Sequence, residues 1–271
     1  MIARVFPRRT NATPDDAYAF VGEPPKEIPA DVAGVDVSCT FTYDRTEAER
    51  LAVLWGRIAP VKIGGPAYNS PAENFVPGRY LKVGYTITSR GCLNYCWFCS
   101  VSKREGNIRE LPILEGWNIL DSNLLACSDD HILRVFRMLS FQSRKAEFTG
   151  GLEAKRLKEW HACELKKLKT KQMFFAYDTP DDWEPLYIAS KMMWQAGFTP
   201  ASKSVRAYVL IGFPKDTIFE AEKRLQRTLA IGVVPMAMLW LNEKGEKQKD
   251  WSTFQRLWAR PAFMKVPKIL L

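Results

Sequence analysis

A repeated order of short apolar segments and amphipathic helical patterns, from residue 81 to residue 241, constrains the fold of this chain more than any other feature. The apolar segments predict six strands, at 82–89, 117–121, 146–149, 173–177, 206–211 and 233–240. Between the later strands, apolar residues recur at helical spacing in 130–141, 153–168, 183–196 and 217–231. Such alternation is typical of a parallel sheet with right-handed crossovers. We expect an α/β fold, a partial (β/α)6 TIM-like barrel, because a closed eight-fold barrel typically needs about 250 residues.

The segments on either side of the expected barrel are smaller. Residues 1–80 predict a small N-terminal α/β segment, with a strand at 33–42, a helix at 46–58 and a strand at 60–65. Pro, Gly, Asn and Ser are frequent in 66–80, which indicates a linker. Residues 242–271 predict a basic tail, in which a helix packs across one end of the barrel through Trp251, Phe254, Leu257 and Trp258. The predicted domains are thus 1–80, 81–241 and 242–271.

The composition is that of an ordinary globular protein. Hydrophobic residues make up 46% of the 271 residues and charged residues 25%, so the chain can bury a sizeable core. No run of 18 uncharged apolar residues appears, and the basic start of the sequence is not followed by the apolar stretch of a secretory signal. We therefore expect a cytoplasmic protein that does not interact with membranes.

The positive charge of the chain is concentrated in two segments. The net charge is +9, and the excess of Lys and Arg lies in 154–171 and 241–271. A basic face can attract nucleic acid or another polyanion. The alternative is a solvated helix face and a basic tail without a partner, and the sequence leaves both interpretations open.

The spacing of three cysteines narrows the function. Cys92, Cys96 and Cys99 form a C-x3-C-x2-C motif directly after the first expected barrel strand. Three thiolates can bind three irons of a 4Fe–4S cube and leave the fourth iron open, whereas a ferredoxin supplies four. A zinc site would need a fourth ligand nearby, and the next histidine is His131. The other cysteines are scattered, and we expect inert thiols at Cys39, Cys127 and Cys163.

With this motif after the first of six strand–helix units, the sequence resembles the radical S-adenosylmethionine (radical SAM) superfamily, and in particular compact members from bacteria and their phages. The resemblance covers about residues 80–241. It implies a reduced 4Fe–4S cluster, with Phe98 shielding one side, whose open iron binds S-adenosylmethionine (SAM). Reductive cleavage yields a 5′-deoxyadenosyl radical that abstracts hydrogen from a substrate. It also implies an external electron donor of the flavodoxin or ferredoxin type. The substrate is unknown, and nucleic acid or another polyanion is one possibility.

The resemblance implies two alternative sites for the SAM amine. By strand count the matching segment follows the second strand and contains Asp121 and Asn123. A Gly-Gly pair with a nearby acid, at 150–151 and Glu153, occurs one strand later. We expect only one of the two to hold the amine, with preference for the first. In that case Glu153 and Lys155 would point toward the substrate or the SAM carboxylate.

Three later strand ends match cofactor positions of the family. Asp178 suits a hydrogen bond to the SAM ribose, or else it caps the helix that begins near Pro180. Gly212 would allow the adenine ring to approach, and Met236 and Met238 would offer backbone groups to the adenine edge, although core packing also explains these methionines.

The N-terminal segment resembles the end of the Rossmann-like domain of cobalamin-dependent radical SAM enzymes. No histidine precedes His131, so the cobalt-binding motif is absent and we expect a shortened relic without cobalamin. A hypothesis from another class is a non-catalytic iron–sulfur or metal-binding protein that interacts with nucleic acid. That hypothesis predicts a bound metal but no SAM cleavage.

Overall fold

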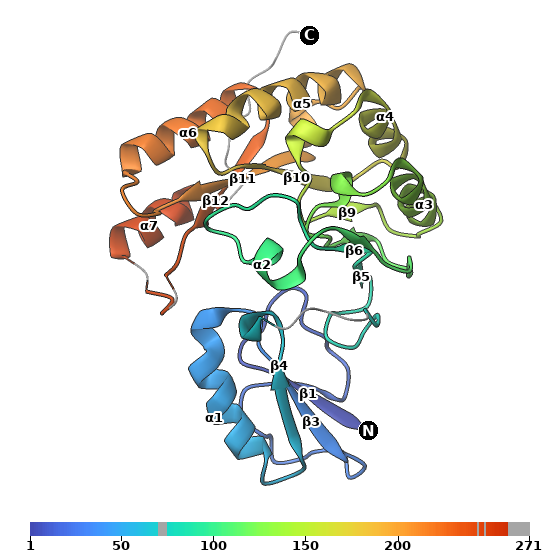
Figure 1. Ribbon diagram of the computed structural model, residues 1–271, viewed down its shortest axis with the longest axis vertical. Coiled ribbons are helices and arrows are strands. Elements are labelled where there is room, and N and C mark those ends of the chain that lie inside the picture. The colour runs from blue at the N-terminus through green and yellow to red at the C-terminus, as the bar shows by residue number, and fades with distance from the viewer. Residues whose placement is uncertain (70–74, 243, 247, 260–271) are drawn as a thin grey trace.

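The computed structural model describes residues 1–69, 75–242, 244–246 and 248–259, which form two units with separate hydrophobic cores (Figure 1). The smaller, N-terminal unit lies below the larger one in this view. Part of the expected linker (70–74) and the end of the expected tail (260–271) lie outside the described residues. Within the described part of the chain, no helix is both long and apolar enough to cross a membrane.

A four-stranded parallel sheet, in the order β2-β1-β3-β4, forms the N-terminal unit. One helix, α1 (Arg45–Trp55), packs against it and buries Leu51 and Trp55 in the small core. The strands expected at 33–42 and 60–65 are present but shorter, whereas the first two strands are not predicted by the sequence pattern. The strands are β1 (Ile2–Phe6), β2 (Ala19–Val21), β3 (Gly34–Ser38) and β4 (Val61–Gly64).

Six parallel strands form the main sheet of the larger unit, and their order in the sheet follows their order in the chain. This arrangement confirms the expected α/β class with a parallel sheet. The strands are β5 (Tyr85–Thr86), β8 (Asn118–Ile119), β9 (Glu147–Phe148), β10 (Gln172–Tyr177), β11 (Val205–Ile211) and β12 (Val234–Leu239). The helices that connect the later strands are α3 (Asp129–Ser140), α4 (Glu159–Lys167), α5 (Trp183–Gln195) and α6 (Ile218–Ala230).

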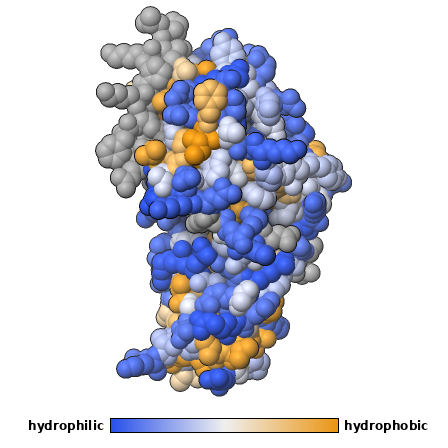
Figure 2. Space-filling model, turned by 90° about the vertical axis from the view of Figure 1, so that its left-hand side faces the viewer, coloured by the Kyte–Doolittle hydropathy of each residue, from blue (hydrophilic) through white to orange (hydrophobic). Residues whose placement is uncertain are grey.

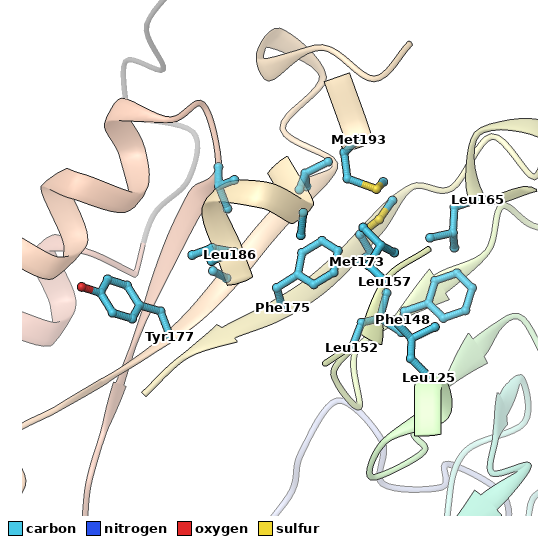
Figure 3. Packing of buried hydrophobic residues seen from close by; sticks show 14 of the residues in the cluster. Leu125, Phe148, Leu152, Leu157, Leu165, Met173, Phe175, Tyr177, Leu186 and Met193 are labelled. Atoms are coloured by element: carbon cyan, nitrogen blue, oxygen red, sulfur yellow. The ribbon is translucent and has the colours of Figure 1, made fainter. Parts of the chain in front are cut away.

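The side chains of the main sheet alternate between its two faces. One face carries Met173 and Phe175, which pack in the large core with Leu186 of α5 (Figure 3). Helices α3 to α6 cover this face (Figure 1). Phe174 and Tyr208 belong to the opposite face, where their rings stack 4.3 Å apart. The sheet therefore has one apolar face under helices and one face of mixed character.

The prediction of a single strand at 82–89, the first expected strand of the barrel, is wrong. The segment divides into β5 of the main sheet and β6 (Ser89–Arg90), which pairs antiparallel with β7 (Arg109–Glu110). The reason lies between the two strands, where the Thr88 backbone N–H donates to Asp121 Oδ1 at 2.6 Å rather than to a neighbouring strand. This contact turns the chain out of the main sheet and into a hairpin.

Two other elements differ from the sequence prediction. The helix expected at 153–168 is a short 3-10 helix (Ala154–Arg156) followed by α4, with Leu157 extended between them. The tail helix is present as α7 (Lys249–Leu257), which buries Trp251 and Phe254 while Leu257 is exposed. A short helix that the pattern does not predict, α2 (Val101–Glu105), lies between β6 and β7.

Candidate functional site

The three motif cysteines lie on the long connection between β6 and β7, and this loop is closed at its base. The Cys92 backbone N–H donates to Gly106 O at 3.1 Å. Gly91 has a φ of +92°, and a Cβ atom at this position would collide with Asn107 O. Only glycine allows such a close backbone crossing. The two ends of the loop therefore adjoin, and the cysteines are held within it.

Hydrogen-bond donors point at two of the three sulfurs. Cys92 Sγ accepts from the Asn94 backbone N–H at 3.4 Å and lies 3.7 Å from Asn123 Nδ2. Cys99 Sγ accepts from the Val101 backbone N–H at 3.5 Å. Hydrogen bonds to sulfur stabilise a thiolate and tune iron–sulfur clusters.

Cys96 lies near several acidic groups. Burial raises the pKa of its thiol, and the nearby Cys99, Cys92, Asp178 and Asp182 raise it further. A positively charged metal centre would reverse this effect, because it stabilises thiolates and releases their protons.

The donor set fits an iron–sulfur cluster. All three thiols are free and half-buried. Among the residues that the structure describes, no three Cys, His, Asp or Glu side chains converge on one point as ligands of a single metal ion. The cysteine ligands of a 4Fe–4S cube bind different irons, so they do not need to converge in this way.

Asp121 has a different role from the cofactor contact that we expected. Its side chain is 1% exposed, and its two oxygens accept three hydrogen bonds, from the Thr88 N–H, the Thr88 hydroxyl and the Ser89 hydroxyl, at 2.6–2.7 Å. Burial raises the pKa of this carboxyl, and the hydrogen bonds oppose that rise. Asp121 thus fastens the end of β8 to the chain that leads into Cys92, and these contacts use both of its carboxylate oxygens.

Asn123 and Glu153, which belonged to the two competing amine sites, lie together in one cluster. Asn123 Nδ2 donates to Glu153 Oε2 at 2.5 Å, and Arg156 Nε donates to the same oxygen at 2.7 Å. Lys155 Nζ lies 2.9 Å from Glu153 Oε1. The two segments are therefore neighbours in space, because the carboxyl ends of neighbouring strands bring them into contact, and which of them holds the amine stays a prediction.

The cluster has two buried acceptors without a hydrogen-bond partner among the described residues, Asn123 Oδ1 and Glu153 Oε1, of which the second faces Lys155 Nζ as an ion pair. Asn123 Oδ1 is buried and accepts no hydrogen bond from any residue that the structure describes. Burial alone would raise the pKa of Glu153, but hydrogen bonds from Asn123, Lys155, Asn94 and Arg156 hold it below its ordinary value. A charged carboxylate and an unpartnered amide oxygen thus lie beside the cysteine loop, which suits a cationic ligand group.

The Gly-Gly pair positions Glu153. A Cβ atom on Gly150 would collide with the backbone of Asp121, so glycine is needed where the ends of β8 and β9 meet. Gly151 has a φ of +110°, and a Cβ atom there would meet nothing within 4 Å. The turn therefore combines a close backbone approach with open space beside it.

Asp178 follows β10 and does not cap the helix after it. The N-cap residue is Thr179, and Asp182 Oδ2 accepts hydrogen bonds from the Thr179 N–H at 2.7 Å and from the Asp178 N–H at 3.0 Å. Burial and the neighbouring Asp182 raise the pKa of Asp178 to about 7. The helix-cap interpretation is wrong, and the Asp178 carboxyl is left for another role.

Gly212 and the two methionines lie near the carboxyl ends of the last two strands. Gly212 has a φ of +71°, and a Cβ atom there would lie 2.6 Å from Leu239 and 3.1 Å from Trp251 of α7. The structure thus explains this glycine by packing against α7, and it lines a cavity of about 170 Å³ beside that helix. Met236 and Met238 share the face away from α5 and α6, where Met238 is 42% exposed.

An aromatic cluster that we did not predict connects the cysteine loop to the same two strands. The Trp97 ring centroid lies 5.3 Å from that of Phe98, 5.9 Å from that of Phe213 and 6.4 Å from that of Trp240. Trp97 is 56% exposed. Figure 2 views the molecule from the α7 side and shows apolar side chains gathered on the larger unit within a mostly hydrophilic surface. The signal in the sequence is an aromatic residue one or two positions after the end of each strand, Phe213 after β11 and Trp240 after β12.

Compared with models of known protein families, the chain matches none, and no curated protein matches it significantly.

Proposed function

We propose that this protein is a radical SAM enzyme with a 4Fe–4S cluster held by Cys92, Cys96 and Cys99. The observation that carries the proposal is the arrangement of three free thiols on one closed loop between β6 and β7, shortly after the first strand (β5) of a parallel α/β sheet. N–H groups directed at two of the sulfurs give the environment that bound thiolates need. When bound, the reduced cluster supplies the electron that cleaves SAM to a 5′-deoxyadenosyl radical, which abstracts hydrogen from the substrate.

The six-stranded sheet is, in this proposal, the wall of a partial (β/α)6 barrel. Strand order that follows chain order and helices on a single face support it. Ligand sites of parallel α/β proteins lie at the carboxyl ends of the strands. The segments after β8, β9 and β10, which carry Asn123, Glu153 and Asp178, all begin at that edge.

Asn123 and Glu153 act as acceptors for the ammonium group of SAM. The unpartnered Asn123 Oδ1 and the charged Glu153 carboxylate supply complementary charge and hydrogen bonds. Lys155 and Arg156 supply positive charge for the carboxylate of the same molecule. Because Lys155 Nζ also lies 3.4 Å from Asn94 Oδ1 in the cysteine loop, the cluster is tied to the metal ligands.

The rest of the cofactor would lie along the later strand ends. The Asp178 carboxyl suits hydrogen bonds to ribose hydroxyls, since it does not serve as a helix cap. Gly212, Met236 and Met238 border the region available to the adenine. Trp97 and Phe98 close the site on the loop side and exclude water from it.

The electron comes from an external donor of the flavodoxin or ferredoxin type. Outside the motif the sequence has three cysteines, of which Cys39 and Cys127 are buried and Cys163 is exposed on α4. These scattered thiols form no second cluster motif.

Anaerobic reconstitution with iron and sulfide tests this proposal. The wild-type protein should bind about four irons and release 5′-deoxyadenosine from SAM when a reductant is added. The triple variant Cys92→Ala, Cys96→Ala, Cys99→Ala should lose both properties. The matched control is Cys163→Ala, which removes an exposed thiol on α4 and should retain both.

The outcomes separate the proposal from its alternative. A cluster that forms and never cleaves SAM, with any reductant, would favour a non-catalytic iron–sulfur protein. Failure to bind iron in the wild type, or equal loss in the Cys163→Ala control, would contradict the cysteine assignment.

A further inference from the structure

A groove of about 720 Å³ lies between the C-terminal ends of α3 and α4. Its floor is apolar and includes Phe136, Leu139 and Leu168. Its rim is strongly basic. The charged rim residues are Arg137, Arg144, Lys145, Lys167, Lys169 and Glu164.

Most of the rim cations are not neutralised. Lys167 pairs with Glu164 at 2.6 Å, whereas the other four have no carboxylate partner in the described ranges of the chain. Arg144 instead lies over the Trp117 ring, 4.5 Å from its centroid. All five cations are exposed. Because unpaired cations that share one groove repel each other, their arrangement favours a bound polyanion.

The groove and the cysteine loop lie at opposite edges of the main sheet. The helices α3 and α4 lead into β9 and β10, so their C-terminal ends lie at the amino edge, while the cofactor residues follow the carboxyl ends. The six residues of β10 span about 20 Å between these edges. The groove is therefore a separate site rather than part of the proposed SAM pocket.

An exposed aromatic ring lies between two groove residues in the chain. Phe141, between Ser140 and Gln142, is 77% exposed and ends α3. A basic groove combined with an exposed aromatic ring is the combination that single-stranded nucleic acid requires, since cations follow the phosphates and the ring stacks on a base. Polyphosphate or an anionic membrane surface would need the cations alone.

We propose that this groove binds single-stranded nucleic acid, with the rim cations on the phosphate backbone and Phe141 stacked on a base. The binding does not depend on the cluster or on SAM. The strand is held about one sheet width from the cysteines, so the groove anchors the strand at a distance from the cofactor site.

Fluorescence anisotropy of the full chain with labelled single-stranded RNA and DNA of about 20 nucleotides tests the proposal. With four phosphate contacts, the logarithm of the binding constant should fall with the logarithm of salt concentration at a slope of about −3. The variant Arg137→Glu, Lys145→Glu, Lys169→Glu should weaken binding about 100-fold and flatten the slope by about 2. The matched control reverses three exposed cations of the N-terminal unit, Lys26, Arg57 and Lys62.

The Phe141→Ala variant separates nucleic acid from other polyanions. It should weaken strand binding about tenfold and leave binding of inorganic polyphosphate unchanged. Equal losses in the groove variant and the control, absence of binding at low salt, or a Phe141→Ala variant that binds the strand as tightly as the wild type would overturn the proposal. Comparing protein with and without reconstituted iron shows whether binding is independent of the cluster, so failure of one proposal does not decide the other.

Discussion

The two edges of the main sheet use charged side chains in opposite ways. At the carboxyl edge, Lys155 and Arg156 both contact the half-buried Glu153, so the polar groups there hold one another in position. At the amino edge, Arg137 and Lys169 point into solvent without a carboxylate partner among the described residues. Paired groups give a rigid site for a small ligand, while unpaired groups give a surface for a large polyanion. Under the two proposals above, the sheet thus separates two kinds of recognition.

The largest expected effect comes from removing the Asp121 carboxylate, whose hydrogen bonds hold the end of β8 to Thr88 and Ser89 at the carboxyl edge. Asp121→Ala leaves the Thr88 N–H and the two buried hydroxyls without their acceptor, so the free energy of unfolding should fall by about 4 kcal/mol. Urea denaturation measures this loss. Asp130→Ala is the matched control, because this carboxylate is exposed, and its loss should stay below about 0.5 kcal/mol. A loss in Asp121→Ala as small as that of the control would contradict the role of Asp121 in fastening the carboxyl edge.

An intermediate effect concerns α4, the helix that runs between the edges. His161 is fully buried, and burial lowers its pKa to about 4. The unfolded chain, with a histidine pKa of about 6.5, binds more protons between these values, so stability is present above pH 6.5 and is lost as pH falls toward 4. We expect a loss of about 2 kcal/mol over this range.

Denaturation of the wild type and of His161→Asn at several pH values isolates this contribution. The asparagine Oδ1 can accept the Lys158 backbone N–H as His161 Nδ1 does, at 3.0 Å in the wild type, but it does not titrate. The variant should therefore lose less stability than the wild type as pH falls. Parallel pH profiles would mean that His161 takes up its proton in the folded chain at the same pH as in the unfolded chain.

The smallest expected effect concerns the charge of the groove rim at the amino edge. Glu164→Gln removes the sole carboxylate of the groove rim and releases Lys167 from its ion pair. Binding of the single-stranded probe should tighten about threefold, and the salt slope should steepen by about 0.7. Anisotropy measures both quantities. Weaker binding in this variant would indicate that Glu164 itself contacts the ligand.

Local pattern predicts much of this fold because apolar periodicity reports burial directly. The α/β class and the later strands and helices follow from it, as in α5 and α6. The strand at 82–89 could not be predicted, because its interruption depends on Asp121, a residue distant in sequence that binds the Thr88 N–H. Three-residue strands such as β2 carry too few residues to show a period.

We predicted the candidate site from each strand end separately. The differences from the structure arise where residues that follow different strands contact one another. Asn123 and Glu153 were treated as alternative amine sites because the sequence alone does not show that the two strand ends bring these side chains into contact. The packing of Trp251 against Gly212 could not be predicted either, because it involves a distant helix. Asp178 could not be separated from Asp182 as a cap without backbone geometry. Residue type indicates the chemistry, while contacts distant in sequence decide which residue performs it.

The closed base of the cysteine loop has an evolutionary consequence. Because its two ends adjoin at Gly91 and Gly106, the conformational entropy of closing the loop is set by the β6–β7 hairpin rather than by the residues in between. A change in the length of the loop therefore leaves the closure at its base, and with it the main sheet, undisturbed. The loop can thus diverge separately from the sheet that carries it, except at its three cysteines and at Asn94 and Trp97, whose side chains contact later segments.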